Sequence, residues 1–100
     1  MSAHLRLINF IQIGDILPNA KKDDKPSALA LHSLYGFVFF INKLPVPTVE
    51  RISLNGLFRK IITVEGLVSP RSLVVDEKFN LLYIMSDVSI IEVDLEGHKR

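Results

Sequence analysis

The sequence predicts an all-β fold built from repeated short strands, and three observations indicate it. One set of anchor residues occurs twice, because the run Pro26 to His32 has the same layout as the run Pro70 to Asp76, 44 positions further on. The segments around these runs are short, apolar and rich in β-branched and aromatic residues, as strands are. No stretch shows the long amphipathic period of a helix. A unit of about four strands that repeats after roughly forty residues is typical of a propeller-type array.

The repeat has two further anchors besides its opening run. An aromatic residue follows that run after seven positions, Phe39 in the first copy and Tyr83 in the second. Each copy then closes on a Leu-Asn-Gly or Leu-Glu-Gly turn, and this anchor repeats after 41 positions, from Gly56 to Gly97. We assign a structural repeat motif, and no chemical role, to these residues: Pro26, Leu29, His32, Phe39, Glu50, Gly56, Pro70, Leu73, Asp76, Tyr83, Glu92 and Gly97.

The predicted strands follow in order from the anchors and from the turn signals between them. A proline can begin a strand but cannot lie inside one, so strands start next to Pro26 and Pro70. The segment from Gly36 to Ile41 is apolar on both faces, as expected of a strand that lies between two sheets. Asn55-Gly56 signals a tight turn, because both residues tolerate a positive φ. The strands are predicted near residues 28–32, 36–41, 48–54, 57–63, 71–76, 80–86 and 89–95.

The residues before the first anchor are less regular. Residues 5–13 are interpreted as a strand, although their spacing also permits a helix, and residues 18–26 as a polar loop. Within the repeats, alternation along each strand selects the apolar side chains that face the core. The residues expected to be largely buried are Leu29, Leu31, Val38, Phe40, Ile52, Leu73, Val75, Leu82 and Ile91.

Composition excludes several classes of protein. The chain has 100 residues, enough for one small domain at most, and a hydrophobic content of 48%, which argues against disorder. Its net charge of +1, with mixed signs, predicts no nucleic-acid partner and no direct membrane contact. Without cysteine it has no disulfide framework and no thiolate metal site. The sequence shows neither a signal peptide nor the run of about 20 apolar residues that a membrane span needs.

No motif predicts catalysis, a metal or a cofactor. The nucleophile-elbow, zinc-protease, phosphate-loop and dinucleotide-binding patterns do not occur. The three histidines, His4, His32 and His98, are far apart in sequence. Neither Ser72 nor Ser86 has a histidine nearby that could act as its base.

Two basic pairs leave one alternative open. Arg59-Lys60 and Lys99-Arg100 would recur on corresponding edges of successive repeats. One interpretation is a basic stripe that recognises an acidic ligand. The other is an ordinary solvated strand edge.

The repeat resembles the YWTD, or class B, repeat of the low-density lipoprotein receptor family. Pro70 to Asp76 matches the opening of that repeat, with serine in place of its glycine, and Tyr83 falls at the motif tyrosine. Glu50 to Gly56 matches the closing strand. In the first copy Phe39 to Asn42 stands where Tyr-Trp-Thr-Asp would be, and His32 replaces an aspartate. The resemblance covers about residues 26 to 100.

The resemblance implies a partial six-bladed propeller of antiparallel, four-stranded meanders. The chain would hold about two blades: residues 1–25 as a weakly matched N-terminal strand and loop, 26–69 as the first repeat, and 70–100 as the second, incomplete repeat. Family propellers tie adjacent blades together through polar motif residues. The remaining blades are expected in a parent chain.

The resemblance also implies a function: a non-catalytic protein-binding module in the extracellular propeller of an endocytic or signalling receptor, with a protein ligand and no cofactor. A nidogen-like, secreted matrix protein is one alternative. A six-bladed propeller hydrolase or lactonase is another, for which Asp76 and Asn42 are the only candidate metal ligands in the sequence. Calcium binding would favour the enzyme.

Overall fold

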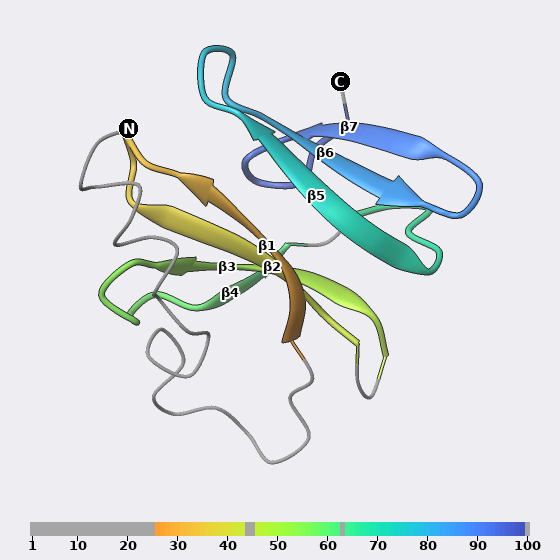
Figure 1. Cartoon of the computed structure of the whole chain (residues 1–100), viewed down its shortest axis with the longest axis horizontal. Helices are drawn as coiled ribbons and strands as arrows, with labels where there is room; N and C mark the ends of the chain where they lie inside the picture. The colour runs from red at the N-terminus through yellow and green to blue at the C-terminus, as the bar shows by residue number, and fades with distance from the viewer. Residues whose placement is uncertain (1–25, 44–45, 63, 100) are drawn as a thin grey trace.

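The structure, a computed structural model, describes residues 26–43, 46–62 and 64–99, which form two antiparallel sheets (Figure 1). The first sheet has the order β1-β2-β3-β4, with β1 Pro26–His32, β2 Phe37–Asn42, β3 Thr48–Ser53 and β4 Lys60–Ile62. The second has the order β5-β6-β7, with β5 Pro70–Asp76, β6 Leu81–Ser86 and β7 Ile90–Asp94. These described residues contain no helix. The all-β prediction and its seven strands are confirmed, whereas the strand predicted over residues 5–13 lies outside the described residues.

Each sheet is a simple meander, because its consecutive strands are joined by tight turns or short loops. The β1–β2 turn ends at Gly36, which has a φ of +68°, and the equivalent residue of the second sheet is Asn80, with a φ of +55°. Glycine adopts a positive φ freely, and asparagine is among the residues that tolerate it best. Both turns therefore keep the same backbone shape, and the second turn gains an amide side chain.

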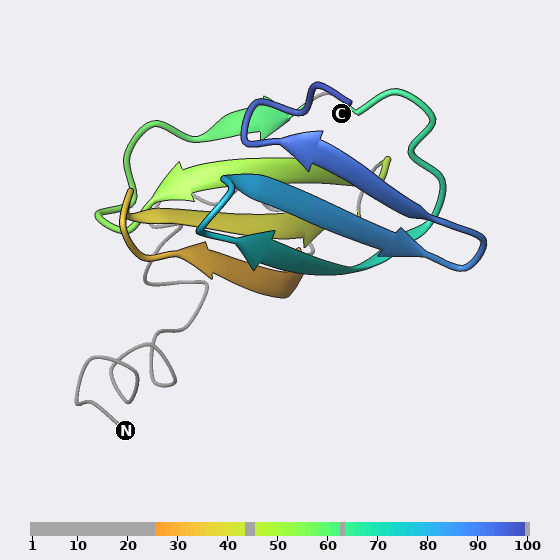
Figure 2. The ribbon, with the colours of Figure 1, turned by 90° about the horizontal axis from the view of Figure 1, so that it is seen from above.

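The main core lies between the two sheets. It is built from alternate residues of each sheet, which point toward the other sheet because side chains in a strand alternate between its faces. The first sheet contributes Phe39, Ile41, Val49 and Ile62, and the second contributes Leu73, Leu82, Ile84 and Val93. Strands β1 and β5 lie side by side and run in the same direction (Figure 2). The sheets thus stack as successive blades of a propeller do.

Strand β2 is buried on both faces, as its apolar sequence predicts. Phe39 faces the second sheet, whereas Phe40 faces the opposite side, and both side chains are 0% exposed. On that opposite side Phe40 forms a second cluster with Val38 and Ile52. The continuous apolar sequence of β2 therefore agrees with the burial of both of its faces.

The predicted core residues fall into three groups. Five of them are buried: Val38, Phe40, Ile52, Leu73 and Leu82. Three are half-buried: Leu31, Val75 and Ile91. The prediction for Leu29 is wrong, because its side chain is 48% exposed.

The exposure of Leu29 has two structural causes. The residue pairs with Phe40 and so shares the face directed away from the second sheet. It also belongs to β1, the edge strand of its sheet, directly after an irregularity at Ala28, which has a φ of +53°. Among the described residues of β1, only Leu31 packs against the apolar cluster on this face.

The inter-sheet core should carry most of the stability. Leu73 is 7% exposed within it, so Leu73→Ala should lower the free energy of unfolding by about 2–4 kcal/mol through lost burial and a residual cavity. The neighbouring Val74, which is 50% exposed on the other face, provides the control, and Val74→Ala should cost much less. Equilibrium unfolding in urea at low protein concentration measures both. A loss below about 0.5 kcal/mol for Leu73→Ala would show that the face is assigned wrongly.

Candidate functional site

The two ends of the sheets differ in character. One end, called the loop end here, carries the β2–β3 and β6–β7 connections and the start of β5. The other, the turn end, carries the β1–β2 and β5–β6 turns and the turn that follows β7. Loops presented by a rigid scaffold are where binding residues usually lie. The loop end is therefore the first place to look for a site.

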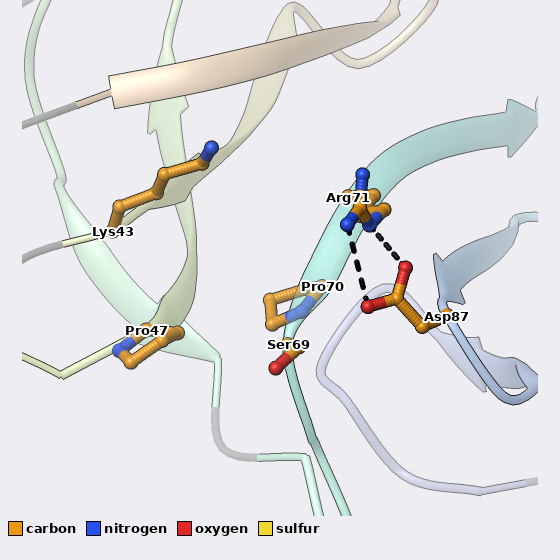
Figure 3. Close-up of a pocket in the computed structure, with 6 residues that line it drawn as sticks. All are labelled: Lys43, Pro47, Ser69, Pro70, Arg71 and Asp87. Carbon is orange, nitrogen blue, oxygen red and sulfur yellow. Dashed lines mark hydrogen bonds and ion pairs between the residues drawn. The ribbon is translucent and has the colours of Figure 1, made fainter.

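A pocket of about 540 Å³ opens at the loop end between the two sheets. It is lined by Lys43, Pro47, Ser69, Pro70, Arg71 and Asp87 (Figure 3). These residues come from the end of β2, the β2–β3 loop, the start of β5 and the β6–β7 loop. The pocket therefore exists only because the sheets stack.

The pocket is polar and accessible. The Arg71 guanidinium meets the Asp87 carboxylate in an ion pair whose side chains are 72% and 52% exposed (Figure 3). Exposed pairs of this kind are held weakly, so a ligand can replace either partner. Lys43 adds an exposed ammonium on the opposite wall, while Pro47 and Pro70 provide apolar surface.

Backbone strain marks the same place. Ser69 lines the pocket with a φ of +44°, although it precedes a proline, a position that favours extended backbone. Strained residues cluster at ligand sites, where the surrounding structure holds them in place. The pocket contains no histidine or nucleophile–base pair among its described lining residues.

The turn end is closed by polar contacts between the sheets. His32 is 0% exposed, and its Nε2 lies 2.7 Å from Oδ1 of Asn80, across the interface. The backbone N–H of Tyr35 donates to Nδ1 at 3.3 Å, which leaves the proton on Nε2 to be donated to Asn80. The Tyr35 ring stacks on the imidazole at 4.4 Å, and its hydroxyl accepts from Asn80 at 3.1 Å.

A second contact lies beside it. The Glu77 carboxylate accepts hydrogen bonds from the Ser33 hydroxyl at 2.8 Å and the Leu34 N–H at 3.0 Å. These two donors hold the pKa of Glu77 below its ordinary value of 4.5. At this second point the first sheet supplies both donors and the second sheet the acceptor.

Arg51 makes the third contact. Its guanidinium donates to the Leu95 carbonyl and to the Glu96 carboxylate, both at 2.9 Å, and lies 4.4 Å above the Phe37 ring. Its side chain is only 14% exposed. Glu96 also pairs with Lys60, and these two cations, Lys60 first, hold its pKa below 4.5. We call the contacts of His32, Glu77 and Arg51 the inter-sheet clamp.

The open question about the basic stripe is answered in part. Arg59 donates to the buried carboxylate of Glu50 at 2.6 Å, and Lys60 pairs with Glu96. Both side chains are therefore occupied within the fold. Lys99 is exposed, and residue 100 lies outside the described residues.

The repeat-motif residues take different places. Pro26 and Pro70 begin β1 and β5, and Gly56 and Gly97 close the two turns with φ values of +82° and +93°. Leu73 and Phe39 lie in the inter-sheet core. Glu50 is 3% exposed beside Asn42, Thr48 and Arg59, whereas Glu92 lies at the position of Arg51 in the first repeat and is exposed. The repeated pattern in the sequence does not predict which of these motif residues are buried and which are exposed. No sequence motif marks Lys43 or Asp87 as pocket residues.

The candidate metal ligands of the enzyme alternative do not converge. Asn42 lies at the loop end, where its Nδ2 donates to Glu50 at 3.1 Å. Asp76 lies at the turn end, where its Oδ1 accepts from the backbone N–H groups of Lys78 and Phe79. Within residues 26–43, 46–62 and 64–99, no group of three or more histidine, cysteine or acidic side chains could hold a metal ion.

Two stacked antiparallel meanders that repeat in sequence define part of a β-propeller with YWTD-type repeats. The sequence is 36% identical to low-density lipoprotein receptor-related protein 5 of Mus musculus and 34% identical to that of Homo sapiens, over 80 residues in each case. These matches cover 77% of this chain and 5% of each relative. The resemblance to the low-density lipoprotein receptor family is therefore confirmed.

The fold comparison agrees. A β-propeller chain from the crystal structure of a nidogen/laminin complex matches with a TM-score of 0.65 and 26% identity, over 76% of this chain and 30% of that one. No family model matches the sequence. The part of the chain that the structure describes has no helix long and apolar enough to cross a membrane.

The inter-sheet clamp should contribute measurably to stability. Arg51→Met removes a half-buried guanidinium and leaves the Leu95 carbonyl and Glu96 carboxylate without this donor, so the free energy of unfolding should fall by about 1.5–3 kcal/mol. Arg71→Met removes an arginine from the exposed pair with Asp87 and should cost about 0–1 kcal/mol. Urea unfolding of both variants checks this. Equal losses would mean that Arg51 is no more important than a surface residue.

Acid should weaken the same clamp. Glu77 and Glu96 have pKa values below 4.5 in the folded chain, so their contribution is complete above that pH and is lost as pH falls through the folded values. The free energy of unfolding should therefore decrease as the pH is lowered below about 4.5. Urea titrations between pH 6 and pH 3 measure this, with Glu96→Gln as the comparison. An unchanged pH dependence in Glu96→Gln would remove this carboxylate from the explanation.

Proposed function

We propose that the chain is a non-catalytic protein-binding module within an extracellular propeller of the low-density lipoprotein receptor type. The observation that carries this proposal is the pocket at the loop end, which is lined by Lys43, the exposed Arg71–Asp87 pair and two prolines. The chain spans about 5% of the length of the receptor-related proteins it matches. The remaining blades would then be supplied by other parts of a parent protein.

The pocket is suited to part of a larger contact. Charged side chains that are mostly exposed steer and orient a partner more than they bind it tightly. The apolar surface of Pro47 and Pro70 lies between them and can cover a side chain of the ligand. We infer a protein ligand that contacts the loop end of several blades, of which this pocket is one point.

A matrix-protein propeller is the second candidate. It is supported by the match to the propeller from the crystal structure of a nidogen/laminin complex. The two candidates share the binding role and differ in the partner. The hydrolase alternative has less support, since its two candidate ligands lie at opposite ends of the sheets.

The binding test uses the full chain and two charge variants. Purified laminin and a panel of purified secreted proteins are applied to the immobilised chain, and affinities are measured by biolayer interferometry. For a protein that binds, Lys43→Glu combined with Arg71→Glu should weaken the affinity by about tenfold or more, which is about 1.4 kcal/mol. Lys78→Glu, a charge reversal at the turn end, should leave it unchanged.

Two outcomes would contradict the proposal. Binding that is unaffected by the pocket variants but lost with Lys78→Glu would place the contact at the turn end. Stoichiometric calcium binding by the chain, together with hydrolysis of a lactone or ester, would favour the enzyme. A strong response to laminin alone within the panel would favour the matrix protein over the receptor.

A further inference from the structure

The second sheet has a face that no described element covers. We call it the outer face of β5–β7; it comprises Val74, Leu81, Tyr83, Met85, Ile90 and Glu92. These residues alternate with the core residues Leu73, Leu82, Ile84 and Val93, so they point away from the first sheet. Val74 and Ile90 are 50% and 68% exposed. An apolar sheet face of this kind is normally covered by another layer.

The repeat shows what kind of layer covers it. The register of the two copies places Tyr83 at the position of Phe39, and Ile90 at the position of Val49. In the first sheet, Phe39 and Val49 are 0% exposed because the second sheet lies over them. The outer face of β5–β7 is therefore the same surface that β1–β4 uses to bind a neighbouring sheet.

The polar positions on the two faces have opposite character. In the first sheet, His32 donates to Asn80 across the interface, and Arg51 donates to Leu95 and Glu96. The equivalent positions in the second sheet are Asp76 for His32 and Glu92 for Arg51. Both donors are replaced by acceptors.

Both carboxylates retain capacity for further donors. Asp76 Oδ1 accepts from two backbone N–H groups of its own turn, and Glu92 is exposed opposite Tyr83 on the neighbouring strand. An ionised carboxylate has about four acceptor sites. In this chain, the turn that follows β7 places Glu96 opposite Arg51. If the neighbouring sheet placed an acidic side chain opposite Glu92 in the same way, two negative charges would meet in a partly desolvated contact.

We infer that the outer face of β5–β7 docks a further sheet of the same repeat class, and that this sheet presents a lysine or arginine opposite Glu92. The inference rests on the proposal that the chain is a segment of a propeller, and it adds the charge of the neighbouring blade. A second copy of this chain does not fit. Its β1–β4 sheet carries Leu54-Asn55 where Leu95-Glu96 stands in the second sheet, and the residues of its corresponding face, Val38, Phe40 and Ile52, are already buried within this chain.

The test adds a third sheet to the full chain. Because Gly97 is equivalent to Gly56, residues 57–100 can be repeated directly after Gly97, which continues the array in register. The appended copy then presents its own equivalent of Glu96 to Glu92. Four proteins form a charge-swap cycle. The first variable is Glu92 of the original chain, which is either kept or replaced in Glu92→Arg. The second variable is the residue of the appended copy that is equivalent to Glu96, which is either kept as glutamate or replaced by lysine.

The expected result is a coupling between the two changes. The lysine in the appended copy should raise Tm by about 3 °C when Glu92 is kept and should lower it when Glu92→Arg is present. Peroxide oxidation of Met85 should be slower in the extended chain than in the original chain, since the added sheet covers it. Unfolding should remain a single transition.

Each other result overturns the inference. If the two changes had additive effects on Tm, the charge opposite Glu92 would not select the neighbouring sheet. Slower oxidation of Met85 would in that case still confirm a sheet interface. Unchanged oxidation of Met85 in all four proteins would show that no sheet docks there. A defined dimer of the original chain that protects Met85 would identify a second copy as the occupant. The binding test at the loop end is independent of these outcomes, so failure of the two proposals can be told apart.

Discussion

The apolar layer between the two sheets is the contact on which the rest of the structure depends. A single blade cannot bury both of its faces, so its stability comes from its neighbours. Phe39 and Ile41 of β2 are 0% exposed because Leu82 and Ile84 of β6 lie against them. Once this layer is formed, the loop end and the turn end of both sheets are aligned. The pocket and the inter-sheet clamp are consequences of that alignment.

The inter-sheet clamp orients the two sheets, whereas the apolar layer supplies most of the free energy that holds them together. Family propellers tie their blades with polar motif residues, and this chain lacks several of them. Here a buried histidine donates to an asparagine, and Arg51 donates to a carbonyl and a carboxylate. Hydrogen bonds to charged groups are stronger than neutral ones, and the low exposure of Arg51 reduces screening by solvent. The two sheets of this chain are therefore joined at the turn end by a histidine and an arginine.

The two ends of the sheets have separate roles. Tight turns at one end are fixed by residues with positive φ, such as Gly36 and Asn80, and by contacts across the interface. The other end carries the β2–β3 and β6–β7 connections, an exposed ion pair and a strained serine. The turn end thus holds the two sheets together through side-chain contacts, whereas the loop end carries the polar pocket. The outer face of β5–β7 adds a second interface, whose acidic residues specify the charge of what lies next to it.

The sequence by itself determined the strands, their order and the repeat. Strand starts at Pro26 and Pro70, the tight turn at Gly56 and the two-sided burial of β2 all depend on local backbone preference and side-chain alternation, which the sequence carries directly. Tertiary structure alone decided the exposure of Leu29 and the separation of Asn42 from Asp76.

Tertiary structure also decided the charge pairs of Arg51 and Lys60 with Glu96, and the pocket between Lys43 and Arg71. The physical reason is that these features join residues far apart in sequence. Their distances are set by how one sheet stacks on the other, and neither sheet carries that information alone.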